Sequence, residues 1–287
     1  MASGFTTTTS LTELVPEITR EVDTIFQNAS IGRQLVNYQD VTGERGTIFE
    51  FPELTEVVAS TGVGETAAPT SHQLDITMPY LTIARRSVYV GPGDLAMKAS
   101  NITPAAIARA MVKAQDKEID TLIFGVTVGT TDFATSAGST DQSMSISYAL
   151  AGLVLLEKNE IDEIPNAVMH PQQYQYIRTG LTPVANDDAI SVSIADVMSR
   201  DAYVGRAFGM NWFNTNRISS GTVDQSDNVY NGLIFAPSAI GYCFSWLYEN
   251  GIESVRDPVS GLTKLVLNWA DSAGVIKASG VCEVNSV

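Results

Sequence analysis

Residues 46–91 read GTIFEFPELTEVVASTGVGETAAPTSHQLDITMPYLTIARRSVYVG, and this stretch decides how the chain is interpreted. It opens with strand character, because Thr47 to Phe51 would place Phe49 and Phe51 on one face of an extended segment. Aliphatic residues recurring between Leu74 and Val90 predict a second set of strands. Between them lies Pro52 to Gln73, which is rich in Thr, Ala and Gly and contains no aromatic residue.

This intervening stretch is far longer than the usual hairpin loop of about two to five residues. Ordering it would cost at least ~1 kcal/mol per residue, or about 22 kcal/mol in all. At ~25 cal/mol per Å², new apolar burial on the order of 900 Å² would offset that cost. Its own side chains can hardly supply this area within one subunit. Either it is mobile or it lies on a neighbouring molecule, and we favour the neighbour.

A long helix is predicted next, from Pro104 to Phe124. Thr103 is a good N-cap, Pro104 suits the first helical position, and Gly125 stops the helix after roughly 30 Å. Charged residues form one stripe and apolar residues the opposite one. The expected charged stripe comprises Arg109, Lys113, Asp116, Lys117 and Asp120, and the apolar one Ala108, Met111, Val112, Ile119, Leu122 and Ile123. Glu118 falls inside the apolar face, so it requires a partner or an edge position.

The N-terminal residues suggest an arm that carries a helix. Ser10 and Glu13 fit a capping box, although Pro16 moves the expected helix start towards Glu17. Apolar residues then recur at helical spacing, namely Leu14, Ile18, Val22, Ile25 and Phe26. The helix either docks on the body of its own subunit or forms part of an extended arm.

The remainder reads as mixed helix and strand. Helices are expected over 147–158, 171–178 and 237–247, and strands over 166–169, 232–236, 252–255, 264–269 and 275–284. Connections are expected over 128–145, 181–189 and 219–228, with turns at 257–258 and 271–274.

Composition excludes several classes of protein. A net charge of −15 disfavours sequence-specific nucleic-acid binding, although an acidic wall can still enclose DNA. No run approaches the ~18–20 apolar residues of a membrane span, and the first ten residues lack the regions of a signal peptide. We therefore expect no membrane association and a cytoplasmic site of synthesis. Cys243 and Cys282 lack metal-ligand spacing and are expected to be small buried residues.

No motif for catalysis, cofactor binding or metal binding is present. The sequence contains no nucleophile elbow, Walker loop, His-Glu-x-x-His or Cys-x-x-Cys. Its two histidines are His72, in the tip of the predicted loop, and His170, at a strand-to-helix corner where a structural role is expected. The acidic clusters Asp187-Asp188 and 224–228 lack the ligand alternation of a calcium loop and are interpreted as solvated turns.

The order of these parts resembles the Hong Kong 97-type fold of tailed-bacteriophage major capsid proteins. Three phrases support the likeness: Asn166-Ala-Val-Met-His-Pro-Gln-Gln-Tyr174, Tyr203-Val-Gly-Arg-Ala-Phe-Gly-Met210 followed by Asn214-Thr-Asn-Arg-Ile218, and Gly232-Leu-Ile-Phe-Ala-Pro-Ser-Ala-Ile240. The resemblance implies an α+β fold with an N-terminal arm (1–45), an extended β-hairpin loop or E-loop (46–91), and a spine helix (104–124). Residues 145–250 would form the axial domain, and 92–144 with 251–287 the peripheral domain. The expected E-loop contains no lysine, so the covalent lysine–asparagine cross-link of some relatives is not expected.

The function implied by this resemblance is a major capsid protein, not an enzyme. It would self-assemble into pentamers and hexamers of an icosahedral virion shell around double-stranded DNA, after assembly in the host bacterial cytoplasm. Expected partners are a separate scaffolding protein, a portal and a decoration protein. The expected assembly interface comprises Phe49, Phe51, Arg85, Arg86, Arg109, Lys113, Asp116 and Lys117. Two alternatives stay open: an encapsulin-type nanocompartment shell, and a cytoplasmic α/β hydrolytic enzyme using dispersed carboxylates.

Overall fold

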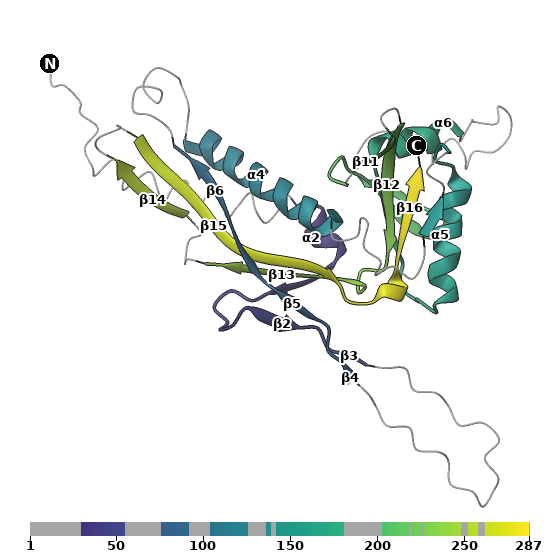
Figure 1. Ribbon diagram of the computed structural model, residues 1–287, viewed down its shortest axis with the longest axis horizontal. Helices are drawn as coiled ribbons and strands as arrows, with labels where there is room; N and C mark the ends of the chain where they lie inside the picture. Colours follow the sequence, from purple (N-terminus) through teal and green to yellow (C-terminus); the bar gives the residue numbers. More distant parts are fainter. Residues whose placement is uncertain are drawn as a thin grey trace, which may run out of the picture.

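Two sheets, each packed against helices, are joined side by side, and one narrow hairpin projects from the body that contains the five-stranded sheet (Figure 1). The structure is a computed structural model that describes residues 30–54, 76–91, 104–125, 136–138, 142–180, 203–218, 220–224, 227–247, 252–257 and 262–286.

The first body is a five-stranded sheet with a long helix on it. Its strands are β1 (Asn37–Asp40), β6 (Ala84–Val90), β13 (Ile240–Trp246), β14 (Ile252–Asp257) and β15 (Leu262–Val275). The long strand β15 is antiparallel to β6 along one edge and to β14 and then β13 along the other. Helix α4 (Pro104–Gly125) packs on this sheet, and the short helix α2 (Gly32–Leu35) lies beside the C-terminal half of α4 (Figure 1).

The second body is a seven-stranded sheet flanked by α5 (Ile146–Lys158) and α6 (Pro171–Gly180). Its strands are β7 (Ser136–Gly138), β8 (Asn166–Met169), β9 (Tyr203–Ala207), β10 (Met210–Asn214), β11 (Ser220–Asp224), β12 (Asp227–Phe235) and β16 (Val281–Ser286). A short 3-10 helix, η1 (Ala278–Gly280), leads from the first sheet into β16. Gln173 fastens α6 to the neighbouring strands β12 and β16, because its buried amide donates to Tyr230 O, Val284 O and Ser286 Oγ.

The projecting part consists of two short ladders in line. Strand β2 (Ile48–Glu50) pairs with β5 (Tyr80–Thr82), and β3 (Glu53–Leu54) pairs with β4 (Ile76–Thr77). Strand β6 follows β5 directly, so the hairpin is continuous with the central sheet. The two predicted strand segments are therefore confirmed. Strand β3 lies within the stretch from Pro52 to Gln73 that was expected to be a loop, and the rest of that stretch falls outside the described residues.

Several predicted elements appear where the sequence placed them. Helix α4 begins at Pro104 and ends at Gly125, β8 spans Asn166–Met169, and α5 and α6 match their expected ranges to within about two residues at each end. The apolar side of α4 is buried as expected, since Ala108, Met111, Val112, Ile119 and Ile123 are all fully buried. Both cysteines are buried with free thiols.

The helix expected over 237–247 is wrong, because residues 240–246 form strand β13. Aromatic residues at every second position, Tyr242, Phe244 and Trp246, suit one face of a strand. Only a turn follows Pro237, and this turn delivers the chain from the second sheet into the first.

Three expected connections are also wrong, in whole or in part. The turn at 271–274 lies within the 14-residue strand β15, and the loop at 219–228 contains β11 and the start of β12, which pair as a hairpin. Part of the connection at 128–145 is strand β7, parallel to β16. In β15 the polar residue Asp271 stays in the strand because its carboxylate has three side-chain donors.

Other predictions fall outside the described residues, namely the N-terminal helix, the loop tip with His72, the cap Thr103 and the loop at 181–189. Among the helices that the structure describes, none is long and apolar enough to cross a membrane.

Candidate assembly interface

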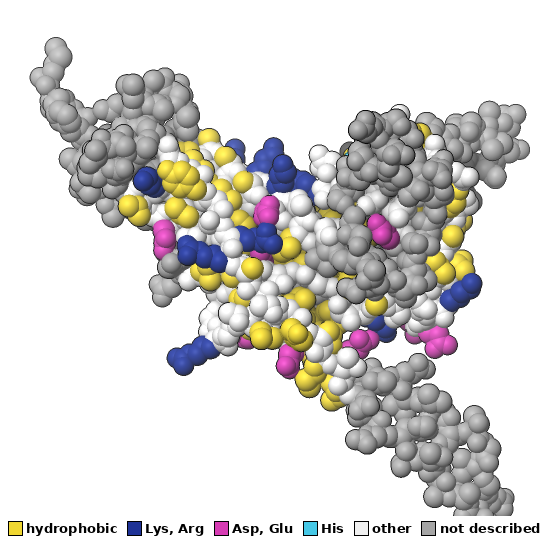
Figure 2. Space-filling model, in the orientation of Figure 1, with side chains coloured by type: hydrophobic (Ala, Val, Ile, Leu, Met, Phe, Trp, Pro, Cys, Tyr) yellow, Lys and Arg dark blue, Asp and Glu magenta, His cyan; other side chains and the backbone are white. Residues whose placement is uncertain are grey.

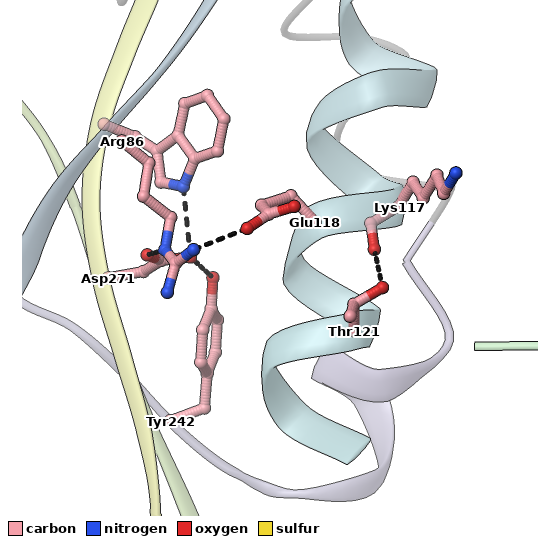
Figure 3. Close-up of polar contacts among 7 residues, drawn as sticks. Arg86, Lys117, Glu118, Thr121, Tyr242 and Asp271 are labelled. Atoms are coloured by element: carbon pink, nitrogen blue, oxygen red, sulfur yellow. Dashed lines mark hydrogen bonds and ion pairs between the residues drawn. The ribbon is translucent and has the colours of Figure 1, made fainter. Parts of the chain in front are cut away.

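The strand that carries the hairpin is tied to the central sheet by a buried carboxylate. Asp271 on β15 is fully buried and accepts hydrogen bonds from Arg86 Nε at 2.6 Å, Trp269 Nε1 at 3.0 Å and Tyr242 Oη at 3.3 Å. Arg86 also donates through Nη1 to Glu118 Oε1 on α4 at 2.6 Å (Figure 3). These contacts join β6, β15, β13 and α4 at one point. Of the partner or edge position expected for Glu118, the structure provides both: Arg86 is the partner, and the Glu118 side chain is 50% exposed.

Burial changes the pKa values of Asp271 and Tyr242. It raises the pKa of Asp271, while the bonds from Trp269 and Arg86 oppose the rise. The pKa of Tyr242 is also raised well above its usual value, by burial and then by the negative charge of Asp271. The guanidinium of Arg86 is the cation that compensates Asp271, and the side chain of Arg86 is 27% exposed. Arg85 points to the same strand and donates from Nη2 to Asn268 Oδ1 at 3.0 Å.

Phe49 and Phe51 lie inside the subunit. They are 7% and 5% exposed and pack with Val41 and Cys243 in a small core at the base of the hairpin. Leu81, Ile83 and Ile276 complete this core. The two phenylalanines therefore hold the hairpin onto its own sheet and leave little surface for a neighbouring molecule.

The opposite face of the hairpin presents large apolar side chains to solvent. Ile48 is 57% exposed, Ile76 50%, Met78 52% and Tyr80 65%. The pairing of Phe49 with Leu81 and of Glu50 with Tyr80 explains this division, because residues on alternate positions of a strand point to opposite faces. Hydrophobic side chains gather over these strands in Figure 2. We call Ile48, Ile76, Met78 and Tyr80 the hairpin apolar face.

Sequence reasoning missed this face, although a signal for it was present. Assigning Phe49 and Phe51 to one side of the strand placed Ile48 on the other side. Because the hairpin carries apolar residues on both faces, both faces are expected to be buried against other protein. One side receives it from the subunit.

The charged stripe expected on α4 is divided by the fold. Arg109, Lys113 and Lys117 are exposed as expected, and Lys117 points away from the Arg86 network in Figure 3. The acidic members are wrong, because Asp116 is 6% and Asp120 5% exposed. Asp120 Oδ1 accepts from Ser30 Oγ at 2.9 Å and from the backbone N–H of Gly32 at 3.0 Å, which explains its position under α2.

The buried acid Asp116 is the most perturbed carboxyl of the helix. Its Oδ1 has no hydrogen-bond partner. Burial and the neighbouring charge of Asp120 raise its pKa to about 7, against the attraction of Arg217 and Arg33. Two carboxylates one helical turn apart under the same cover disfavour ionisation of both.

Chemistry is sparse in the described part of the chain. The described residues hold no group of three His, Cys, Asp or Glu that could bind a metal ion. The His170 ring stacks on Tyr230 with centroids 4.5 Å apart, and its Nδ1 accepts from the backbone N–H of Gln172. Burial lowers the pKa of His170, consistent with a packed structural residue at the start of α6.

No model of a known protein family matches the sequence, and no curated protein matches it. Solved structures do match its fold. A chain from Mycobacterium phage Che8 has a TM-score of 0.64 at 17% identity and covers 89% of this chain and 90% of its own length. The capsid of Ralstonia phage GP4 matches with a TM-score of 0.64 at 9% identity, covering 88% and 86%.

A virus-like particle from Pyrococcus furiosus matches with a TM-score of 0.57 at 10% identity, covering 94% of this chain and 98% of its own. At such low identities these likenesses establish the arrangement of the chain and not its role. Because they extend over nearly the whole length of each protein, they concern the complete fold rather than one of the two sheets. The chain therefore has the Hong Kong 97-type capsid fold, with mixed helices and strands.

Proposed function

We propose that this chain is the major capsid protein of a tailed bacteriophage, and that it assembles into pentamers and hexamers of an icosahedral shell around double-stranded DNA. The fold it shares with phage capsid chains supports this role. The observation that carries the proposal is the hairpin apolar face, whose four side chains are 50–65% exposed on a narrow projection of the described chain. Large apolar surfaces of this kind mark sites of protein association.

The cover for this face is a second copy of the same chain. Tyr80 and Met78 are residue types enriched at the buried centres of protein interfaces. Glu50 is paired with Tyr80 across the hairpin and lies on the same face. Its charge disfavours non-specific association of this face with other proteins. A closed shell repeats the contact at every subunit, so a modest affinity per contact suffices for a stable particle.

The proposed division into domains follows from this role. Residues 46–91 act as the E-loop, and α4 as the spine helix. Residues 92–144 and 251–287 form the peripheral domain, and 145–250 form the axial domain. Strand β13 belongs to the 145–250 segment yet pairs with β15, so the two proposed domains share a sheet.

The proposed interface comprises the hairpin apolar face with the exposed cations of α4 as a charged flank. Further proposed partners are a separate scaffolding protein, a portal and a decoration protein, none of them bound through a cofactor or metal. Assembly takes place in the host bacterial cytoplasm, and the mature protein resides in the virion. The chain acts as a structural subunit rather than an enzyme, in keeping with the fold that it shares with phage capsid chains.

A second candidate is an encapsulin-type compartment, which the likeness to a virus-like particle supports no better than the likeness to phage chains supports the capsid. The two candidates share the shell and differ in its contents. Negative-stain microscopy of the full chain, expressed alone and with the other head proteins of its genome, tests for shells. Nuclease-protected DNA inside purified particles supports the phage capsid, whereas co-purifying protein cargo without DNA supports the compartment. A monomer under all these conditions contradicts both.

A further inference from the structure

Helix α2 bridges the two bodies of the fold (Figure 1). At its start, the backbone N–H of Gly32 donates to Asp120 Oδ1 on α4 at 3.0 Å. At its end, the carbonyl oxygen of Leu35 accepts from Asn166 Nδ2 on β8 at 3.2 Å. The four residues of α2 therefore contact the long helix of the first body at one end and the sheet of the second body at the other.

Four charged side chains meet at this junction. Asp116 and Asp120 come from α4, Arg33 from α2, and Arg217 from the segment that follows β10 of the second body. Arg217 and Arg33 attract the carboxylate of Asp116, and Asp120 repels it. We call these four residues the junction cluster. Both bodies contribute charge to it.

Arg217 is tied to the second body by its own backbone. The N–H of Thr215 donates to Met169 O on β8 at 3.1 Å, and the N–H of Arg217 donates to Thr215 Oγ1 at 3.2 Å. The next residue, Ile218, is buried in the same core as the apolar side of α4. Arg217 Nη1 is buried and has no hydrogen-bond partner among the described residues, so its attraction to Asp116 acts without a direct bond.

The two aspartates of the cluster differ in their hydrogen bonds. Asp120 Oδ1 accepts from Ser30 Oγ and from the N–H of Gly32, and these bonds oppose the rise that burial causes in its pKa. Asp116 is 6% exposed, and within the described part of the chain its Oδ1 has no donor. Because two carboxylates one helical turn apart disfavour joint ionisation, the proton resides on Asp116. Its pKa of about 7 agrees with this assignment.

We propose that Asp116 is a proton-dependent switch for the contact between the two bodies. With the proton bound, the neutral side chain stays buried, and α4 packs closely against the segment that carries Arg217. Once the proton is lost, the buried carboxylate recruits water, and the junction opens more often. This role is separate from assembly, because it concerns contacts within one subunit.

The direction of the effect follows from proton linkage. When the junction opens, water reaches Asp116, and its pKa returns towards the ordinary value of 3.8. Between about pH 4 and 7 the closed junction then binds a proton that the open junction has released, so a rising pH favours opening. Attraction of the carboxylate to Arg217 and Arg33 opposes this trend, but burial is the largest influence on Asp116 and the repulsion by Asp120 the next.

Hydrogen exchange of the full chain, measured by mass spectrometry, tests the proposal. The reporter is the peptide that covers α2, because the N–H of Gly32 is bonded within the junction. Dividing its protection in the unmodified chain by that in Asp116→Asn at each pH cancels the intrinsic pH dependence of exchange. We expect this ratio to fall about tenfold from pH 5 to pH 8, equivalent to ~1.4 kcal/mol. Asp116→Ser serves as the reference if Asp116→Asn does not fold.

Two further substitutions test the members of the cluster, each made in both the unmodified and the Asp116→Asn chain. Arg217→Gln removes a cation that favours ionisation of Asp116, so the pH at which the ratio falls should rise by about one unit. Asp120→Asn removes the like charge and should lower that pH. Glu157→Gln, an exposed change on α5, should leave it unaltered.

Local opening must also be distinguished from unfolding of the whole chain. At pH 8 the α2 peptide should exchange at least tenfold faster than the peptides of the paired strands β12 and β16, since only the junction opens. Equal protection of α2 and these strands at every pH would mean that Asp116 acts only through global unfolding, and the proposal would be wrong.

Two other results would overturn the proposal. One is a ratio that is the same at pH 5 and pH 8, because the opening of the junction would then release no proton from Asp116. The other is a transition whose pH does not respond to Arg217→Gln, which would separate the second body from the switch. Exchange can be measured on free subunits and on shells alike, so these outcomes do not depend on the proposed function.

Discussion

Arg86 Nε lies 2.6 Å from Asp271 Oδ1, and this contact connects the strand that leads out of the hairpin to the centre of the main sheet. Asp271 has no exposed surface, so Arg86 is the cation that allows it to remain inside. Trp269 and Tyr242 both donate to the other carboxylate oxygen, which leaves the group fully bonded. Asp271 is paired with Phe244 of β13 on one side and with Ala84 of β6 on the other. A register shift of β13 or β6 would therefore leave the buried carboxylate without its partners.

Replacing Arg86 by Met should destabilise the subunit by ~3–5 kcal/mol, because Asp271 is then buried without a cation. Urea denaturation followed by circular dichroism measures the loss. The control is Glu118→Gln, which breaks the more exposed pair with Arg86 and should cost only ~0–1 kcal/mol. Equal losses in the two variants would mean that Arg86 acts through α4 rather than through Asp271.

The hairpin apolar face should matter for assembly and little for folding. Changing Ile48, Met78 and Tyr80 together to Ser should alter the free energy of unfolding by less than about 0.5 kcal/mol per site, because all three are half exposed or more. Light scattering should show that shells or capsomers are lost. The matched control is Val154→Ser on α5, at an exposed apolar site away from the hairpin. Normal particles from the triple variant would contradict the proposed interface.

Phe49 should behave in the opposite way to Tyr80, although the two residues lie on facing strands. Phe49→Ala should cost ~3–5 kcal/mol of subunit stability, because Phe49 fills the small core beneath the hairpin. Gly241→Ala should also destabilise, by ~1–3 kcal/mol, since a methyl group there presses on Ile276 and Phe51. Thermal unfolding checks both. A stable Phe49→Ala protein that fails only in assembly would show that this core belongs to an interface.

Elements determined by interactions between residues close in sequence could be predicted, and elements determined by long-range pairing could not. Helix α4 could be predicted because its signals are local: Pro104 at its start, Gly125 at its end and a continuous apolar row between them. Strand β13 could not, because Pro237-Ser-Ala resembles a helix start, and only pairing with β15, some 29 positions further on, selects the extended form. Tertiary pairing overrides local propensity in such segments.

The candidate site shows the same limit. Glu118 was expected to need a partner or an edge position, and it has both, because its side chain is 50% exposed and accepts from Arg86. Asp116 and Asp120 were placed with the exposed cations because periodicity describes only one helix. Their burial results from α2, whose contact through Ser30 and Gly32 comes from almost 90 residues away.

Stability should depend on pH through Asp116. Its pKa is raised to about 7 from an ordinary value of 3.8, first by burial and then by Asp120. Between about pH 4 and 7 the native state therefore holds a proton that the unfolded chain has released. Because the native state binds more protons in this window, the free energy of unfolding contributed by this group falls as the pH rises through it, and the deficit persists above pH 7.

Asp116→Asn removes this titrating group. The free energy of unfolding that the variant gains over the unmodified chain should be ~1–2 kcal/mol larger at pH 8 than at pH 5, once the lost attraction to Arg33 and Arg217 is included. Urea denaturation of both proteins at the two pH values measures the difference. Asp162→Asn, an exposed change after α5, should leave the pH profile unaltered. A variant whose stability relative to the unmodified chain does not change with pH would show that Asp116 is ionised throughout.

Shortening the hairpin separates folding from assembly most sharply. Leu54 is paired with Ile76, so deleting Thr55 to Gln73 and replacing Leu74-Asp75 by Asn-Gly closes the two strands with a two-residue turn. The described base of the hairpin keeps Phe49, Phe51 and Leu81 in their core, and the circular dichroism spectrum and unfolding midpoint should stay near those of the full chain. Shells should fail to form or should dissociate on dilution, because the deleted residues are expected to find their burial on a neighbour. Shells of normal size and heat resistance from this variant would remove residues 55–73 from the proposed interface. An unfolded variant would place those residues in the core of the subunit instead.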